Sequence, residues 1–322
     1  MRRRDFIALA GSAAITWPSD LRAQKSAPRV GVLLYSSPEA DPQVESFRLG
    51  LRDLGYIEGR NLTIEYRYAE GRPERLPRLA AELAQSKPDV ILALGGDVAP
   101  WAKKATVSIP LVFAVSTDPV RSGLVVTLGR PVGNATGVTL LQDELASKRL
   151  ELLKEAAPQV SRVAFLWNPD HADNEYGLAE RAAQKIGIEL RPAEMRGPGD
   201  LQGAFDAATQ AHADALYVVS SRHTAANIPS IVGFATKNRL PLAGGWGAWA
   251  RAGGLLSYGP NINDMIRRTA TYVDRVLKGA KPADLPIQQP TKFELVINIT
   301  TAKALDLKIP ESFLLRADEV IE

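Results

Sequence analysis

The sequence predicts an α/β protein of two similar lobes, each built on a parallel sheet with helices on both faces. Its 322 residues are enough for two domains at about 100–200 residues each. Short β-rich runs alternate with helical segments from residue 29 onward, which is typical of parallel sheets. The order of these elements is repeated in the second half of the chain.

Lobe one begins at 29–35 with RVGVLLY, a continuous apolar run that fits a strand buried on both faces. A helix is predicted at 44–54, because its apolar residues recur at helical spacing and Gly55 follows as a helix end. The other elements predicted for this lobe are strands at 61–68, 89–94, 110–115 and 136–139 and helices at 76–85 and 101–106.

Lobe two follows a helix predicted at 144–156. Four segments of lobe one recur in it in the same order, at offsets between 125 and 133 residues. The pairs are 29–37 with 162–170, 61–71 with 187–197, 88–96 with 213–221, and 109–117 with 240–248. Any two parallel strands look alike, so the shared order and offset are the evidence that the lobes have one design.

The C-terminal part starts with a strand at 253–258 and an amphipathic helix at 264–278 that Gly279 ends. The proline-containing stretch 280–290 is predicted to be extended, and a strand at 293–299 and a short helix at 301–307 follow. We therefore expect an organisation in three parts. Lobe one takes 24–141 plus about 259–290, lobe two takes 142–258, and a tail at 291–322 crosses between them as part of a hinge. The sequence leaves open which lobe holds the tail.

An export signal is predicted at residues 1–23. Three arginines at 2–4 precede an apolar stretch at 6–17, which is too short to span a bilayer. The order Arg-Arg-Asp-Phe-Ile at 3–7 is similar to the twin-arginine export pattern, with general secretion as the alternative route. Leu-Arg-Ala at 21–23 offers a cleavage site, so we expect a periplasmic mature protein that begins near Gln24. The absence of a lipobox cysteine predicts that it carries no lipid anchor.

Composition excludes several classes of function. Hydrophobic residues are 45% and charged residues 23%, which is globular, and no apolar run reaches the ~18 residues of a membrane-spanning helix. Basic residues exceed acidic ones by 3 in the whole chain and by 1 after residue 23, too few for a nucleic-acid binder. The chain has no Cys, no dinucleotide or P-loop motif and no nucleophile elbow. Because His171, His212 and His223 also lack metal-ligand spacing, we expect no metal and no cofactor.

Polar residues follow the predicted strands where each apolar run stops. In open parallel sheets, ligands bind at these carboxyl ends. The loops in question read Ser36-Ser37, Gly95-Gly96-Asp97, Ser116-Thr117-Asp118, Trp167-Asn168-Pro169-Asp170, Ser220-Ser221-Arg222 and Gly244-Gly245-Trp246-Gly247, with Tyr258 after the last strand. If the lobes face each other, hydroxyls, backbone N–H groups and aromatic faces line a cleft for a small polar ligand with an apolar part. Asp97 or Asp118 could pair with an ammonium group.

Each of these residues also has a purely structural interpretation, because Ser, Thr, Asn and Asp cap the helices that follow strands. For single residues the two interpretations are evenly balanced. For the set of loops as a whole, a cleft is favoured.

Several stretches resemble one family. They are IPLVFAVSTDPVRSGLV at 109–125, RPVGNATGV at 130–138, SKRLELLKEAAP at 147–158, AGGLLSYGPN at 252–261, YVDRVLKGAKPADLPIQQPTKFELVINITTAKALDLKIP at 272–310, and the ending RADEVIE. Through them the chain is similar to the substrate-binding proteins of ABC transporters of the tryptophan/tyrosine type. These are type I periplasmic binding proteins. The resemblance covers nearly all of the chain after the signal.

The resemblance implies two Rossmann-like lobes joined by crossing strands, which close on a small molecule like a Venus flytrap. It also implies delivery to an ABC permease driven by a separate ATPase, by a monomer that is not embedded in the membrane. By position, the ligand-binding residues implied are Ser36, Ser37, Gly96, Asp97, Ser116, Thr117, Asp118, Asn168, Ser221, Arg222, Trp246 and Tyr258. The loop at 243–247 departs from the family pattern where the variable part of the ligand would lie.

Two other functions fit the same scaffold. A ligand sensor for a receptor kinase differs from a transport protein only in its partner. A hydrolase is compatible with the fold, but the nucleophile and cofactor motifs it would need are missing. The export signal and the lack of a helix-turn-helix before residue 29 argue against a repressor with similar lobes. We therefore expect a binding protein for an amino-acid-like ligand or an aromatic carboxylate, and no enzyme.

Overall fold

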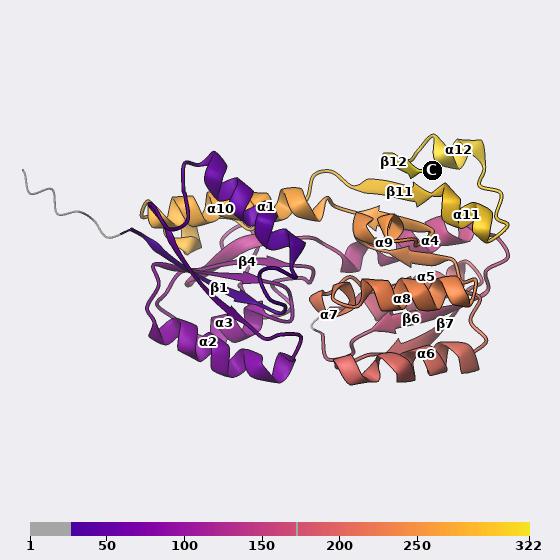
Figure 1. Ribbon diagram of the computed structural model, residues 1–322, viewed down its shortest axis with the longest axis horizontal. Helices are drawn as coiled ribbons and strands as arrows, with labels where there is room; N and C mark the ends of the chain where they lie inside the picture. Colours follow the sequence, from indigo (N-terminus) through magenta and orange to yellow (C-terminus); the bar gives the residue numbers. More distant parts are fainter. Residues whose placement is uncertain (1–26, 172) are drawn as a thin grey trace, which may run out of the picture.

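The computed structural model describes residues 27–171 and 173–322 as two lobes that lie side by side (Figure 1). The predicted export signal and the predicted start at Gln24 lie outside these residues. In the part that is described, no helix combines the length and the apolar character needed to cross a membrane.

Lobe one is built on a parallel five-stranded sheet in the order β2-β1-β3-β4-β5. The strands are β1 (Arg29–Leu34), β2 (Thr63–Tyr68), β3 (Val90–Leu94), β4 (Leu111–Val115) and β5 (Ala135–Thr139). Its helices are α1 (Pro42–Asp53), α2 (Leu76–Gln85), α3 (Ala99–Ala105) and α10 (Ile262–Leu277), with short 3₁₀ turns η1 (Pro73–Arg75) and η4 (Pro282–Asp284).

The helix α10 belongs to lobe one although it comes late in the chain. It packs beside α1 on one face of the sheet (Figure 1). The approach is close, since a Cβ added at Gly50 would lie 2.4 Å from the carbonyl oxygen of Arg267. Ile266, Ala270 and Val273 are buried in this contact, as their helical spacing predicts. The helices α2 and α3 cover the opposite face.

Lobe two contains a seven-stranded sheet in the order β12-β11-β10-β9-β8-β6-β7. The strands are β6 (Arg162–Trp167), β7 (Glu189–Glu194), β8 (Ala215–Val218), β9 (Leu242–Gly244), β10 (Leu256–Gly259), β11 (Glu294–Asn298) and β12 (Glu319–Ile321). The helices are α4 (Ala146–Ala156), α5 (Glu175–Lys185), α6 (Leu201–Gln210), α7 (Arg222–Ala225), α8 (Ile228–Lys237), α9 (Gly247–Arg251), α11 (Ile299–Ala304) and α12 (Glu311–Leu314), with η2 (Asp143–Leu145) and η3 (Pro198–Asp200). The core on one face contains α4 and α5, and the core on the other contains α6 and α8.

The tail lies in lobe two. Its strands β11 and β12 extend the second sheet, and β11 is antiparallel to β10. The pairing is therefore not parallel throughout, which differs from the sheets that the sequence predicts. The chain leaves lobe two after β10, forms α10 in lobe one and returns, so β11 enters the sheet from the opposite end. The segments that connect the lobes are 140–145, 260–261 and 289–293.

Several element boundaries differ from the predicted ones for local reasons. The strand predicted from 253 starts at Leu256, because Gly253 and Gly254 close the end of α9 through hydrogen bonds to Ala250 and Trp249. The helix predicted from 264 starts at Ile262, because Asn261 caps it by accepting a hydrogen bond from the Asp264 N–H. The helix predicted from 144 begins with the 3₁₀ turn η2.

Candidate functional site

The loops at the carboxyl ends of the strands in the two lobes face each other and are joined by polar pairs. One pair is Arg222 with Asp41, a second is His171 with Asp97, and a third is His223 with Tyr35. In each pair the first residue belongs to lobe two and the second to lobe one. The strand ends that the sequence singles out therefore meet across the lobe boundary.

The Arg222–Asp41 pair is buried. The Nη1 atom of Arg222 donates to both carboxylate oxygens of Asp41, at 3.1 and 3.0 Å, and both side chains are less than 10% exposed. Ser221 caps α7 and so places Arg222 in its first turn, while Asp41 caps α1. The arginine passes so close to Gly95 that a Cβ there would lie 2.7 Å from Arg222 Cγ, and Gly95 has a φ of +122°, so a side chain at this position is excluded.

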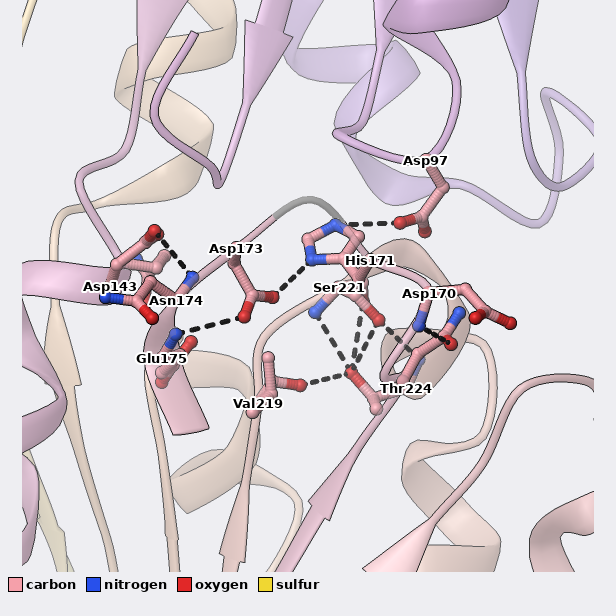
Figure 2. Close-up of polar contacts among 12 residues, drawn as sticks. Asp97, Asp143, Asp170, His171, Asp173, Asn174, Glu175, Val219, Ser221 and Thr224 are labelled. Atoms are coloured by element: carbon pink, nitrogen blue, oxygen red, sulfur yellow. Dashed lines mark hydrogen bonds and ion pairs between the residues drawn. The ribbon is translucent and has the colours of Figure 1, made fainter. Parts of the chain in front are cut away.

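The imidazole of His171 lies between two carboxylates (Figure 2). Its Nε2 atom is 2.7 Å from Oδ1 of Asp97 in lobe one, and its Nδ1 atom pairs with Oδ2 of Asp173 in its own loop. The other oxygen of Asp173 accepts a hydrogen bond of 3.0 Å from the Glu175 N–H at the start of α5. The ring is thus placed at the lobe boundary with one carboxylate on each side.

Attraction between opposite charges shifts the pKa values of both His171 and Asp97. Burial by itself lowers the pKa of His171, but the two carboxylates, Asp97 foremost, outweigh it and hold the pKa well above its ordinary value. Burial by itself raises the pKa of Asp97, but attraction to His171 outweighs it and the pKa lies below its ordinary value. The pair is therefore an imidazolium against a carboxylate.

Tyr35 and His223 meet edge to face, with ring centroids 5.7 Å apart. The Tyr35 hydroxyl donates to the carbonyl oxygen of Gly71 at 2.9 Å and lies 2.5 Å from Nδ1 of His223. Because the hydroxyl has one proton, Nδ1 of His223 is the donor in the second contact. Burial lowers the pKa of His223, which fits a neutral ring in this position.

A second buried cluster surrounds Arg149 of α4 beside the connecting segments. Its Nε atom donates to the carbonyl oxygen of Tyr258 at 2.7 Å, and its Nη1 atom donates to the carbonyl oxygen of Gln142 at 3.2 Å. Nη1 also pairs with Oε1 of Glu175 at 2.5 Å and donates to the Tyr217 hydroxyl at 2.9 Å. Burial raises the pKa of Glu175 to about 8 despite this arginine. Arg149 thus ties Gln142 of the connecting segment 140–145 to Tyr258 of β10 and Glu175 of α5 in lobe two.

Some of the predicted site residues form hydrogen bonds with backbone N–H groups of their own loops. Asp118 accepts a hydrogen bond from the Val120 N–H, Asn168 accepts one from the Asp170 N–H, and Ser221 accepts one from the Thr224 N–H. Ser37 accepts bonds from the N–H groups of the following turn. These are the capping roles that the sequence leaves as the structural alternative.

Other predicted residues present unused polar atoms. Oδ2 of Asp97 and Oγ1 of Thr117 are buried without a hydrogen-bond partner. Both side chains lie next to Gly96, where an added Cβ would be 2.9 Å from Thr117 Cγ2 and 2.8 Å from His171 Nε2. Buried polar atoms without partners are rare in proteins, so this corner of the boundary is suited to a polar ligand.

The remaining predicted residues are distributed along the boundary. Ser36 and Trp246 line a pocket of about 90 Å³ together with Asp41 and Arg222. Asp118 lines a second pocket of about 190 Å³ with Arg121, Asp143 and Asn174. Ser116 accepts the Gln142 N–H through its carbonyl oxygen, and Tyr258 contributes its carbonyl oxygen to Arg149.

Sequence reasoning missed several residues of the boundary, namely Tyr35, Asp41, Gln142, His171 and His223. His171 and Asp173 follow directly on the Asn168 loop, so the polar run at 168–175 was an available signal. Asp41 had the weaker signal of a cap before a helix. His212, by contrast, is exposed, as predicted.

This geometry defines a class of protein, a two-lobed α/β protein whose lobes meet over a polar, ligand-sized boundary. The fold is that of the type I periplasmic binding proteins, which its structural neighbours share. The chain belongs to the family of ABC transporter substrate-binding proteins, whose family model matches residues 29–321. This family consists of transport proteins rather than enzymes, and its members take a small-molecule ligand to a membrane permease.

Individual relatives cover most of the chain. A tyrosine-binding protein of Clostridioides difficile (strain R20291) is 26% identical over 294 residues, which are 90% of this chain and 83% of the relative. A conserved domain protein of Vibrio cholerae O1 biovar El Tor is 31% identical with a TM-score of 0.85, covering 91% of this chain and 99% of that one. The ABC domain from Streptococcus pneumonia in complex with L-Trp is 27% identical with a TM-score of 0.84, covering 92% and 100%.

Proposed function

We propose that this protein captures a small amino-acid-like ligand between its lobes and delivers it to an ABC permease that works with a separate ATPase. The observation that carries the proposal is the pair of unpartnered buried atoms, Oδ2 of Asp97 and Oγ1 of Thr117, at the boundary between the lobes. A ligand that bonds both atoms would be held by lobe one and enclosed by lobe two. The relatives that bind tyrosine and L-Trp support a ligand of this size.

The charges at the boundary favour a ligand with an ammonium group. The guanidinium of Arg222 is neutralised by Asp41, and the donors of Arg149 are occupied by Glu175, Tyr217 and two backbone carbonyl oxygens. Oδ2 of Asp97 lies buried and unused, so a donor group on the ligand fits there better than another carboxylate. Of the two ligand classes that the sequence predicts, an amino-acid-like molecule is therefore favoured over a simple aromatic carboxylate. A ligand carboxylate would rely on hydroxyls and backbone N–H groups.

Capture requires the lobes to open and close. The connecting segments 140–145, 260–261 and 289–293 lie together on the molecule and are the places where a hinge motion would act. The ligand drives closure only as far as it binds the closed arrangement better than the open one. We extend the proposal to the other residues predicted by position, Ser36, Ser37, Gly96, Ser116, Asp118, Asn168, Ser221, Trp246 and Tyr258, as the lining of the cleft.

The place of action that we propose is the periplasm, reached by the twin-arginine route and followed by cleavage before Gln24. The basic and apolar start of the chain supports export, and the family works with membrane permeases. We propose a monomer, since the polar boundary that holds the ligand is completed by the two lobes of one chain.

The test is a ligand screen on residues 24–322, unfolded and refolded to remove carried ligand. L-Tryptophan, L-tyrosine, the matching amine-free aromatic carboxylates, nucleosides and small amides are compared by thermal shift and then by calorimetry. Ligand at 100 times its dissociation constant should stabilise the fold by about 2.7 kcal/mol, which raises the melting temperature by several degrees.

The outcomes separate the alternatives. A saturable shift with an amino acid that is lost in Asp97→Asn, and recovery of the intact compound, support the proposal. A shift with the amine-free carboxylates alone contradicts the role of Asp97. Recovery of altered compound would instead support a hydrolase.

A further inference from the structure

The side chain of His171 contacts a carboxylate in each lobe, and these contacts suggest a role for His171 other than ligand binding. One of its ring nitrogens faces Asp97 at the end of β3, and the other faces Asp173 in its own loop (Figure 2). Its side chain is 2% exposed and that of Asp173 is 3% exposed. Water is therefore largely excluded, and the charge on the ring is balanced by the carboxylates around it.

Opening the lobes would change only one side of this arrangement. Asp173 is two residues from His171 in the same loop and would stay beside it. Asp97 belongs to lobe one and would move away with it. The imidazole would then lose one carboxylate and gain contact with water, so its affinity for a proton depends on whether the lobes are closed.

The other charged groups around the ring affect the protonation of His171 less than Asp97 and Asp173 do, or act against them. Asp143 in η2 adds negative charge on the same side, but burial and the neighbouring Asp173 raise its own pKa to about 6. Arg222 and His223 of α7 face the same Asp97 carboxylate, but Arg222 is already paired with Asp41 and His223 is held neutral by burial. Asp97 and Asp173 therefore remain the groups that decide the protonation of His171.

We propose that closure of the lobes takes up a proton at His171, so that the closed arrangement gains population as the pH falls and loses it as the pH rises. His171 then acts as a proton-dependent latch between the lobes. The latch acts without ligand, because Asp97 binds His171 through Oδ1 and leaves Oδ2 unused.

The sign follows from proton linkage. In the closed form the Asp97 carboxylate lies 2.7 Å from Nε2 of His171 and favours the protonated ring, whereas the open form keeps only Asp173, so we expect the closed form to bind the proton more tightly than the open form. The stabilisation is complete below the pKa of the open form and is lost as the pH rises through the pKa of the closed form. One proton limits the effect to about a tenfold change in the closed-to-open ratio per pH unit.

Two ligand-free measurements test the proposal. The chain has three histidines, so NMR can follow each ring during a titration from pH 5 to 9, with His171→Gln to assign the signal. In the same range, spin labels on Glu39→Cys and Ser230→Cys report the distance between lobes, because both residues are exposed and lie in different lobes and the chain has no other Cys.

We expect the His171 ring to titrate well above its ordinary range, and the short-distance population to fall up to tenfold per pH unit as it does so. In Asp97→Asn, which keeps the ring, its pKa should move toward the ordinary value and the distance should lose most of its pH dependence. In His171→Gln the dependence should disappear, and in the exposed control His212→Asn it should stay.

Two results would overturn the latch. One is a distance distribution that is the same at all pH values in the wild type. The other is a His171 titration that Asp97→Asn leaves unchanged. Because no ligand is added, neither result bears on whether the protein binds an amino acid, and the calorimetric screen above decides that question separately.

Discussion

Nη1 of Arg222 in lobe two lies 3.0 Å from Oδ2 and 3.1 Å from Oδ1 of Asp41 in lobe one. The two residues are 181 positions apart in the chain, and each sits at the start of a helix that faces the other lobe. The sequence predicts that Arg222 contacts the ligand. In the structure its guanidinium is paired with Asp41, and we propose that this pair supports the closed form.

Replacing Arg222 by Gln should therefore weaken ligand binding without removing a ligand contact. The closed form loses its ion pair and buries Asp41 unpaired, whereas the open form lets water reach that carboxylate. We expect the dissociation constant for the amino acid selected in the screen to rise by about 10- to 100-fold, measured by calorimetry, which is about 1.4–2.8 kcal/mol.

A double-mutant cycle with Asp41→Asn isolates the pair, since the second substitution should cost little once the first is present. Arg196→Gln is the matched control, because its partners Asp170 and Glu194 are exposed and such pairs contribute little. An unchanged affinity in Arg222→Gln would show that the pair does not support the closed form.

Thr117→Val should lower ligand affinity and leave stability unchanged. Valine has nearly the same shape, and the hydroxyl it removes has no partner in the protein, so the folded protein loses no hydrogen bond. If the ligand bonds Oγ1, affinity should fall by about 1 kcal/mol, roughly fivefold. Calorimetry and urea unfolding measure the two effects.

Thr136→Val provides the comparison for this prediction. Its hydroxyl is also fully buried but donates to the carbonyl oxygen of Leu285 at 2.6 Å. This variant should lose about 1–3 kcal/mol of stability and keep its affinity. Equal affinity in Thr117→Val and wild type would remove Thr117 from the site.

Asp143 should make stability fall with rising pH in the acid range. Burial, followed by the neighbouring Asp173, raises its pKa from 3.8 to about 6, so the folded state holds the proton more tightly than the unfolded state. Its contribution is therefore complete below about pH 4 and lost by about pH 6, and it amounts to at most about 3 kcal/mol.

The variant Asp143→Asn should not lose stability between about pH 4 and 6, because an amide does not ionise. Its side-chain oxygen can still accept the hydrogen bond that the Asn174 N–H donates to Oδ2 of Asp143. The difference in unfolding free energy between variant and wild type, measured in urea from pH 4 to 7.5, should shift in favour of the variant as the pH rises. A constant difference across that range would contradict the raised pKa.

Arg149→Met should destabilise the protein by about 3–5 kcal/mol, because several fully buried oxygen atoms would lose their donor and Glu175, whose pKa burial raises to about 8, would lose the cation that favours its carboxylate form. The carbonyl oxygens of Gln142 and Tyr258 would lose a donor as well. Urea unfolding measures the loss. The double variant Arg149→Met with Glu175→Gln should be less destabilised than the single one, and an equal loss in both would mean that packing rather than charge dominates.

The sequence predicted elements well where their signal is local. The apolar run at the start of lobe one became β1, and the stripe through Ile266, Ala270 and Val273 became the buried face of α10. Element ends shifted by a few residues, because caps such as Asn261 and turns such as Gly253–Gly254 depend on geometry that periodicity does not report. The antiparallel entry of β11 had no local signal at all, since its direction depends on where the preceding helix is placed.

For the site, the sequence by itself determined which loops carry polar side chains to the strand ends, because an apolar run that stops at Asp97 or Ser221 is visible in the letters. Only the tertiary structure decided what those side chains do. Arg222 pairs with Asp41 and Asp97 pairs with His171 because the two lobes bring distant loops together, while Asn168 and Asp118 turn back to their own backbones. The apolar pattern along a segment indicates which of its residues are buried. Which residue pairs with a charged side chain at the boundary depends instead on how one lobe is positioned relative to the other.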